Sequence, residues 1–182
     1  MSNRELGQLF PIIISDPDPN WIALFNEEKR MITNSLGVQN IISIEHIGST
    51  SVPNLKAKPT IDILIEVPSN FKKDEFIEKL YGLGYLFTPK PENPAPHMMF
   101  MKGYTENGFR GQAYHIHVRY SGDWDELYFR DYLIANPDIA EEYGELKVRL
   151  ANQFKNDREE YTNSKTEFIE RVTDVARKTQ SK

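Results

Sequence analysis

The chain of 182 residues contains no cysteine, which excludes a disulfide framework and any metal site with thiolate ligands. Its longest wholly apolar run, Phe10 to Ile14, is far shorter than the roughly 20 residues that span a bilayer. Residues 1–8 are polar, unlike a secretory signal. A cation excess is also missing, since 22 basic residues face 27 acidic ones, so we expect no general nucleic-acid binding. We therefore expect a cytoplasmic protein without a membrane segment.

The length fits a single domain, 1–182. Apolar periodicity and turn residues predict a helix over 19–36, with Asp18 as its cap, and a second helix over 71–83. Strands are predicted over 41–47, 60–67, 85–87, 98–104 and 113–120, the last two forming a hairpin. Three helices are predicted over 123–135, 137–154 and 157–178. We expect an α/β core over about 1–120 and a helical C-terminal part over about 123–178 that packs on it.

A short polar loop between two predicted strands carries the strongest chemical signal. Gly48 is followed by three hydroxyl residues, Ser49, Thr50 and Ser51, and such a loop exposes backbone N–H groups that suit a phosphate. Asp62 lies on the returning strand, where a carboxylate next to bound phosphates could help to hold Mg²⁺. The alternative is structural, because serine and threonine often cap helices and an aspartate can accept hydrogen bonds from the backbone.

These residues occur in longer segments that resemble the GrpB family, a divergent branch of the nucleotidyltransferase superfamily. The resemblance runs roughly from residue 14 to residue 176 and includes two Tyr-x-x-x-Lys pairs, which end at Lys147 and Lys165. The other matching segments are 46–53 (His-Ile-Gly-Ser-Thr-Ser-Val-Pro), 58–64 (Lys-Pro-Thr-Ile-Asp-Ile-Leu), 115–118 (His-Ile-His-Val) and 129–133 (Phe-Arg-Asp-Tyr-Leu). The resemblance implies an α+β fold: a nucleotidyltransferase-like mixed β-sheet with flanking helices and a helical C-terminal part. Some relatives are fused to dephospho-CoA kinase.

The chain departs from the superfamily pattern at the metal-binding acids. Leu64 stands where a second acid normally follows Asp62, and Glu66 lies about 13 Å further along the strand, too far to replace it. The superfamily's third acid lies on a later strand, where this chain has histidines. Asn54 also replaces a glycine that is usual in the family. These departures place conventional two-metal nucleotidyl transfer in question.

His115 and His117 are two residues apart on a predicted strand, so both imidazoles lie on one face. Together with Asp62 they could bind a divalent metal, Mg²⁺, Mn²⁺ or Zn²⁺, and leave positions open for water or substrate. Alternatively, a protonated histidine could bind phosphate, or one histidine could act as a general base. A structural pair of partly buried histidines is the remaining alternative.

Several cations could assist. Lys58 precedes the Asp62 strand and is well placed to neutralise phosphate, although it could also be a solvated loop lysine. Arg119 shares the face of the two histidines and could either bind a phosphate or pair with an acid. Arg130 is expected to form a surface ion pair with its neighbour Asp131. Lys147 and Lys165 each follow a tyrosine by one helical turn, so their stems can lie on the ring while their ammonium groups reach a cleft or water. Glutamates of the helices, such as Glu27 and Glu28, are expected to face solvent.

These observations favour binding of a nucleotide or another phosphorylated small molecule, with metal-dependent nucleotidyl transfer as a possible activity. Gly48, Ser49, Thr50, Ser51, Lys58 and Arg119 are the expected phosphate-binding residues, Asp62 the expected catalytic residue, and Asp62, His115 and His117 the expected metal ligands. The alternatives are a non-catalytic nucleotide- or CoA-related binding module and a histidine-metal hydrolase. The loop lacks the second glycine and the Lys-Ser/Thr of a P-loop, which argues against a kinase or ATPase of that class.

Overall fold

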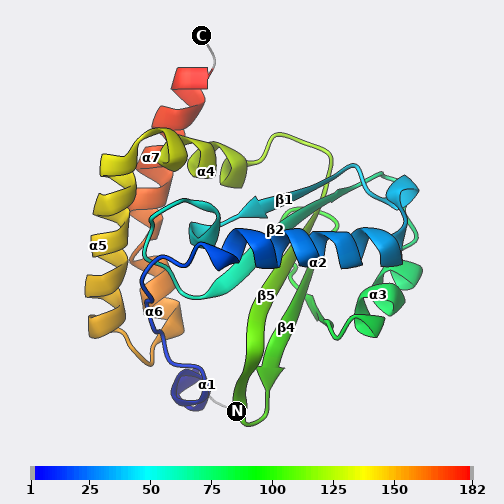
Figure 1. Cartoon of the computed structure of the whole chain (residues 1–182), viewed down its shortest axis with the longest axis horizontal. Helices are drawn as coiled ribbons and strands as arrows, with labels where there is room; N and C mark the ends of the chain where they lie inside the picture. The colour runs from blue at the N-terminus through cyan, green and yellow to red at the C-terminus, as the bar shows by residue number, and fades with distance from the viewer. Residues whose placement is uncertain (1–2, 181–182) are drawn as a thin grey trace.

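The computed structural model describes residues 3–180. Its centre is a five-stranded mixed sheet with the strand order β1-β2-β5-β4-β3. The strands are β1 (Ser43–Ile47), β2 (Thr60–Val67), β3 (Leu86–Pro89), β4 (Met98–Thr105) and β5 (Gly108–Tyr120). Neighbours pair antiparallel except β2 and β5, which are parallel. The expected mixed α+β fold with a helical C-terminal part is confirmed (Figure 1).

Two helices cover one face of the sheet, and four others stand on the opposite side of the molecule (Figure 1). The first pair is α2 (Asn20–Leu36) and α3 (Lys73–Gly82). The C-terminal group is α4 (Asp125–Ala135), α5 (Pro137–Gln153), α6 (Arg158–Asn163) and α7 (Thr166–Gln180). A short helix α1 (Asn3–Leu9) precedes them, and single 3₁₀ turns occur at η1 (Val38–Asn40) and η2 (Ser49–Ser51). No helix among residues 3–180 is long and apolar enough to span a bilayer.

The alternation of side chains along β2 and β5 decides which groups enter the core and which face the C-terminal helices. Ile61, Ile63 and Ile65 of β2 and Ile116 and Val118 of β5 are fully buried in the main core, together with apolar side chains of α2 and α3. Because successive strand residues point to opposite faces, the residues between them point to the other side. Those residues include the acid and the two histidines singled out above.

Two parts of the helix prediction need correction. Residues 157–178 do not form one helix, because the chain breaks after α6 and α7 starts at Thr166. At this break the Lys165 carbonyl accepts the Ile169 N–H and so acts as the first acceptor of α7. Helix α1 was not predicted, since its sequence carries no apolar stripe that marks a helix face.

Smaller differences concern the ends of elements. The first long helix begins at Asn20, so Pro19 and not Asp18 occupies the cap position; the Asp18 carboxylate lies one residue earlier and accepts the Asn20 N–H at 2.9 Å. Strand β3 begins one residue later than predicted, at Leu86, because Tyr85 belongs to the turn that ends α3.

Candidate metal and phosphate site

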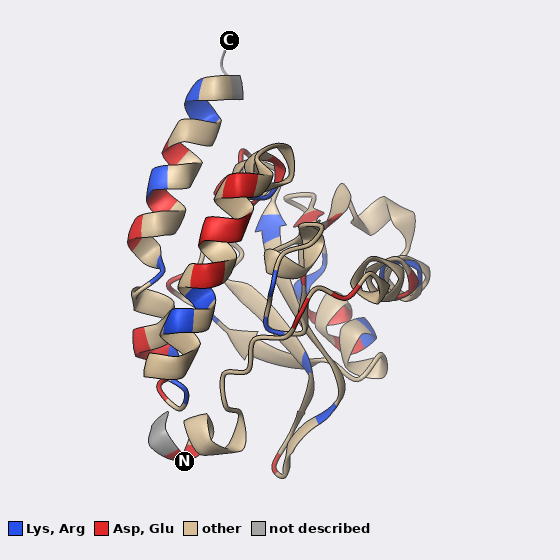
Figure 2. Ribbon diagram, turned by 60° about the vertical axis from the view of Figure 1, so that its left-hand side comes forward, with Lys and Arg blue, Asp and Glu red and all other residues tan. Residues whose placement is uncertain are grey.

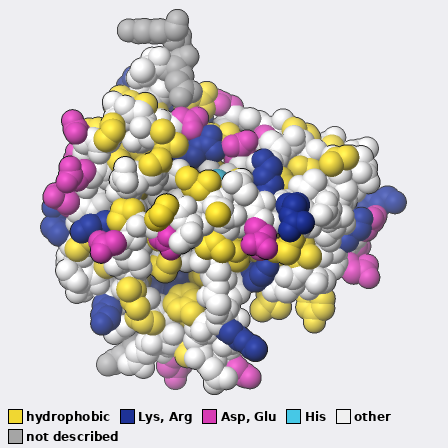
Figure 3. Space-filling model, in the orientation of Figure 1, with side chains coloured by type: hydrophobic (Ala, Val, Ile, Leu, Met, Phe, Trp, Pro, Cys, Tyr) yellow, Lys and Arg dark blue, Asp and Glu magenta, His cyan; other side chains and the backbone are white. Residues whose placement is uncertain are grey.

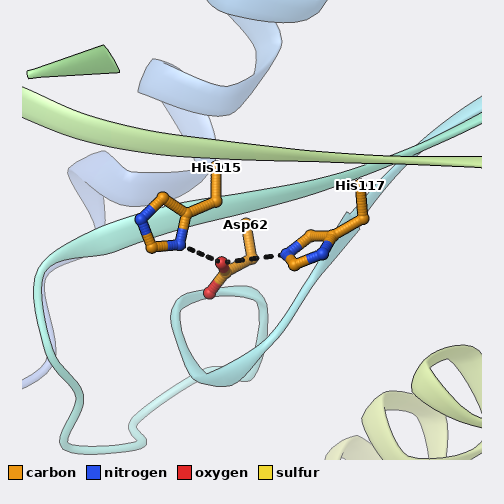
Figure 4. A group of neighbouring side chains, drawn as sticks. All are labelled: Asp62, His115 and His117. Atoms are coloured by element: carbon orange, nitrogen blue, oxygen red, sulfur yellow. Dashed lines mark ion pairs between the residues drawn. The ribbon is translucent and has the colours of Figure 1, made fainter. Parts of the chain in front are cut away.

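The register of the sheet brings the three expected metal ligands together. Asp62 on β2 lies directly opposite His115 on the parallel strand β5, and His117 is opposite Leu64. All three side chains point to the face that the α2–α3 layer leaves open. Figure 4 shows the imidazoles approaching the Asp62 carboxylate from two sides. The geometric condition for a shared site is therefore met.

The ligand atoms are close enough to bind one ion. His115 Nδ1 lies 3.2 Å and His117 Nε2 lies 3.6 Å from the same Asp62 oxygen, Oδ1. One donor atom of each of the three residues lies within 4.8 Å of the others. The solvent-exposed fractions of their side chains are 27% (Asp62), 13% (His115) and 22% (His117), so solvent reaches the three residues. One carboxylate and two imidazoles form a donor set suited to Zn²⁺ or Mn²⁺.

The residues around Asp62 keep its carboxyl group ionised. Burial raises the pKa of its carboxyl group, but hydrogen bonds from the His115 and His117 imidazoles, and their charges, outweigh this effect and hold the pKa far below its usual range. The carboxylate is therefore ionised at neutral pH, as a metal ligand must be.

Tyr104 of β4 fixes the orientation of His115. The Tyr104 hydroxyl lies 2.8 Å from His115 Nε2, and the two rings stack with centroids 5.5 Å apart. A metal-binding histidine usually makes a hydrogen bond through its second ring nitrogen, and this bond sets which nitrogen offers its lone pair. Here the contact at Nε2 leaves Nδ1 directed at Asp62. The sequence analysis missed this residue, because a tyrosine on a strand gives no local signal of such a role.

Gly48 makes the space beside the carboxylate. A Cβ atom at this position would lie 2.7 Å from Asp62 Oδ2. The residue also has φ of +72°, a conformation that side chains other than glycine rarely adopt. Steric exclusion and backbone conformation therefore both require glycine here.

The three hydroxyl residues after Gly48 do not share one role. Thr50 donates to the Thr60 carbonyl at 3.0 Å, and Ser51 donates to the Gly48 carbonyl at 2.5 Å. Both residues are buried, so their hydroxyl groups stabilise the loop. Ser49 is half-buried and hydrogen bonds to the hydroxyl of Tyr143 on α5. Of the three hydroxyls, the Ser49 hydroxyl is the one placed beside the cleft.

A cavity of about 620 Å³ opens beside this loop. Its lining includes Gly48, Ser49, Asp62 and His117, together with the rings of Trp124 and Tyr143. A larger hollow of about 870 Å³ between the 53–56 loop and helices α4 and α5 contains none of the metal-site residues. The smaller cavity is therefore the one in which a ligand would meet the metal site.

The second acid of the superfamily pattern has no substitute. Leu64 is fully buried between Glu45 on β1 and His117 on β5. Glu66 accepts hydrogen bonds from Ser43 Oγ, Gly122 N and Trp124 Nε1 at 2.7, 2.9 and 3.1 Å, respectively. Glu66 thus links β2 to β1 and to the loop after β5, and it lies at the opposite end of β2 from Asp62. Asp62 is therefore the one carboxylate of β2 in this group.

The structure places Asn54 and Lys58 as follows. Asn54 has φ of +60°, which asparagine tolerates better than other side chains with a Cβ atom, so the loop keeps the conformation that a glycine would allow. Lys58 is half-buried near Asp62. Burial and the nearby Arg158 and Lys165 charges lower its pKa to about 8, although Asp62 acts in the opposite direction.

Two arginines have structural partners. Arg119 is buried next to Trp124 and donates to Glu126 and to the Val118 carbonyl, at 3.4 and 3.1 Å. It does not line the cavity beside Asp62. Arg130 is more than the surface ion pair expected, because it also binds Glu45 at 2.8 Å and the His46 carbonyl at 3.0 Å, joining α4 to β1.

Glu28 also differs from the expectation of a solvated helix face. It is buried and accepts hydrogen bonds from Tyr85 at 2.9 Å and Lys102 at 2.7 Å, on the α2 side of the sheet. The charges visible on the face in Figure 3 are mixed, with Lys and Arg lying among Asp and Glu.

Comparison with known proteins agrees with this architecture. The GrpB protein family profile matches residues 11–175. A UPF0157 protein of Pseudomonas aeruginosa is 41% identical over 157 residues, 85% of this chain and 63% of that protein, so this chain spans less than two thirds of it. The glutamate-rich protein GrpB of Alkalihalophilus pseudofirmus is 34% identical over 88% of this chain and 93% of its own length. A dephospho-CoA kinase of Mycolicibacterium paratuberculosis is 28% identical over 84% of this chain and 42% of its own length.

Solved structures give the same assignment. The crystal structure of conserved protein GrpB from Enterococcus faecalis superposes with a TM-score of 0.81 and 32% identity, covering 93% of this chain and all of that one. The Cid1 poly(U) polymerase has a TM-score of 0.51 and 13% identity, covering 84% of this chain and 46% of that chain, a likeness of fold alone. The chain therefore belongs to the GrpB family and has a fold related to that of the nucleotidyltransferases.

Proposed function

We propose that this protein binds one divalent metal ion at Asp62, His115 and His117 and, beside it, a nucleotide or another phosphorylated small molecule. The observation that carries the proposal is the convergence of these three side chains within 4.8 Å. Two imidazole ligands favour Mn²⁺ or Zn²⁺ over Mg²⁺, which prefers oxygen ligands.

The phosphate group is proposed to lie against Gly48 and Ser49, with Lys58 neutralising its charge. Gly48 and Ser49 line the cavity next to Asp62, and Lys58 lies close enough for the Asp62 charge to affect its pKa. A metal ion at this place would supply Lewis-acid polarisation of a phosphoryl oxygen. Gly48, Ser49 and Lys58 would bind the phosphate and hold it in a fixed orientation.

The experiment is calorimetric titration of ATP, CTP and coenzyme A into the protein, with and without Mn²⁺. We expect at least one of them to bind more tightly when Mn²⁺ is present, and this gain to disappear in Asp62→Asn. The control is Asp74→Asn, since Asp74 is exposed on α3, which packs on the opposite face of the sheet. Metal-independent binding of all three compounds, equal in wild type and Asp62→Asn, would refute the proposal.

Nucleotidyl transfer is the first candidate activity of such a site, and a non-catalytic binding module is the second candidate. Buried Leu64, where a second metal-binding acid would stand, favours the second candidate. The match to less than half of a dephospho-CoA kinase is consistent with a module that accompanies another activity. Labelled nucleoside triphosphates incubated with Mn²⁺ and cell extract separate the two: Asp62-dependent transfer of label supports the enzyme, and tight binding without transfer supports the module.

A further inference from the structure

The N-terminal segment, residues 3–15, contacts both the C-terminal helices and the β4–β5 hairpin. Arg158 on α6 donates to the Phe10 carbonyl at 3.0 Å. At the start of β5, a Cβ atom on Gly108 would lie 3.4 Å from the Leu9 carbonyl oxygen, so the two backbones approach closely. Figure 2 shows α1 at the same end of the molecule as the turn between β4 and β5. The segment therefore connects the two parts of the protein at one end of the sheet.

Phe10 packs against two aromatic rings of the hairpin, Tyr104 of β4 and Phe109 of β5. The ring centroids are 5.2 Å apart for Phe10 and Tyr104, 5.0 Å for Phe10 and Phe109, and 5.1 Å for Tyr104 and Phe109. These separations are in the favourable range for aromatic pairs, and Phe10 is buried. Because every pair of the three rings is in contact, the position of the Tyr104 ring depends on Phe10.

Strand pairing alone does not place Tyr104 against the metal ligand His115. His115 pairs with Met101, whereas Tyr104 pairs with Phe109 after a shift in register between residues 102 and 104. Gly103 at this shift has φ of +90°, as expected where a strand departs from regular pairing. The contact between Tyr104 and His115 thus crosses an irregular stretch of the hairpin, and side-chain packing must hold the Tyr104 ring.

We propose that the N-terminal segment positions His115 through Phe10 and Tyr104, and so fixes the direction of the ring nitrogen that binds the metal. The inference rests on the proposed function for its effect on metal binding. Phe10 holds one side of the Tyr104 ring, and Tyr104 stacks on His115 and bonds to its Nε2 at 2.8 Å. Phe10 and Tyr104 are positioning residues, since neither belongs to the metal-ligand group. The family profile begins at residue 11, so Phe10 lies outside the matched range.

The test compares two variants of the full chain. Tyr104→Phe removes only the hydroxyl group, and Phe10→Leu removes the ring that packs on Tyr104. In EDTA-treated protein, both should shift the carbon and proton NMR signals of the His115 ring and leave those of His46 and His97 unchanged. In calorimetric titration with Mn²⁺ and Zn²⁺, Tyr104→Phe should lower the affinity about tenfold or more, and Phe10→Leu about fivefold.

The control is Phe76→Leu, which removes a buried ring on the opposite face of the sheet, where Phe76 contacts Phe71 and Phe100. This variant should lose stability as Phe10→Leu does, but it should keep the metal affinity and the His115 signals of wild type. Thermal unfolding confirms that each variant is folded before it is measured.

Unshifted His115 signals in Phe10→Leu would overturn the inference, as would equal metal affinity in wild type and both variants. The proposed function fails differently. If wild type binds neither Mn²⁺ nor Zn²⁺ while Phe10→Leu still shifts the His115 signals, the metal site is refuted and the positioning of His115 by the N-terminal segment is supported.

Discussion

His46 is expected to make the stability of this protein depend on pH between 6.5 and 4. Its side chain is 8% exposed, its ring stacks on Phe25 with centroids 4.7 Å apart, and Nε2 lies 3.0 Å from Thr50 Oγ1. Because the Thr50 hydroxyl donates its proton to the Thr60 carbonyl, Nε2 must carry the proton in its bond to Thr50. The neutral imidazole with its proton on Nε2 can therefore make the hydrogen bond that this buried side chain needs.

The size of the effect follows from the pKa. Burial lowers the pKa of His46 from 6.5 to about 4, with a smaller lowering by Arg130 and an opposing effect of Asp62. Below pH 6.5 the unfolded chain binds a proton at this residue and the folded protein does not, so the free energy of unfolding decreases as the pH falls toward 4. This difference between the pKa of His46 in the unfolded and folded states corresponds to a loss of about 3 kcal/mol in the free energy of unfolding.

The assay is urea unfolding, followed by circular dichroism, at intervals from pH 7.5 to pH 4. His46→Gln keeps an N–H donor for Thr50 but cannot be protonated, so its unfolding free energy should fall about 3 kcal/mol less than that of wild type over this range. Carboxylates contribute equally to both proteins and cancel in the comparison. His97→Asn, at an exposed position with φ of +62° that asparagine tolerates, should behave as wild type. An identical pH dependence of wild type and His46→Gln would refute the reasoning.

Two further substitutions test the packing around the site and the opposite face of the sheet. Gly48→Ala should cost about 1–3 kcal/mol of stability, because residue 48 has a positive φ. It should also weaken metal binding roughly tenfold or more, because the added Cβ would press on Asp62 Oδ2. Unchanged metal affinity by calorimetry would contradict this. Glu28→Gln should cost about 1–3 kcal/mol in urea unfolding, because Lys102 loses the charge of its buried partner. Glu27→Gln, at an exposed position one residue earlier, should cost close to nothing, and equal losses in the two variants would contradict the role given to Glu28.

The sheet could be predicted from the sequence because its determinants are local. Alternation and β-branched residues mark 60–67 and 113–120, and the i, i+2 spacing of His115 and His117 requires a common face in any strand. The contact between Asp62 and His115 was harder to predict from the sequence, because it depends on the parallel register of two strands separated by about 50 residues. The resemblance to GrpB supplied the expectation that this face looks toward Asp62.

The contacts that could not be predicted are the non-local ones. Nothing near Arg130 in sequence indicates its bond to Glu45 on β1, and nothing near Glu28 indicates Lys102 on β4. The break before α7 was missed because charged residues continue on both sides of it, with no proline or glycine to mark it. Side chains that satisfy one another across elements leave no periodic signal in the chain.

The central claim is that Asp62, His115 and His117 bind one metal ion, and titration of EDTA-treated protein with Mn²⁺ and Zn²⁺ tests it most directly. The account predicts one ion per chain for at least one of the two metals, and a loss of affinity of roughly 100-fold in Asp62→Asn and in His117→Ala, with His97→Asn unchanged. Absence of binding by the folded wild type, or equal affinity in Asp62→Asn and wild type, would contradict the account.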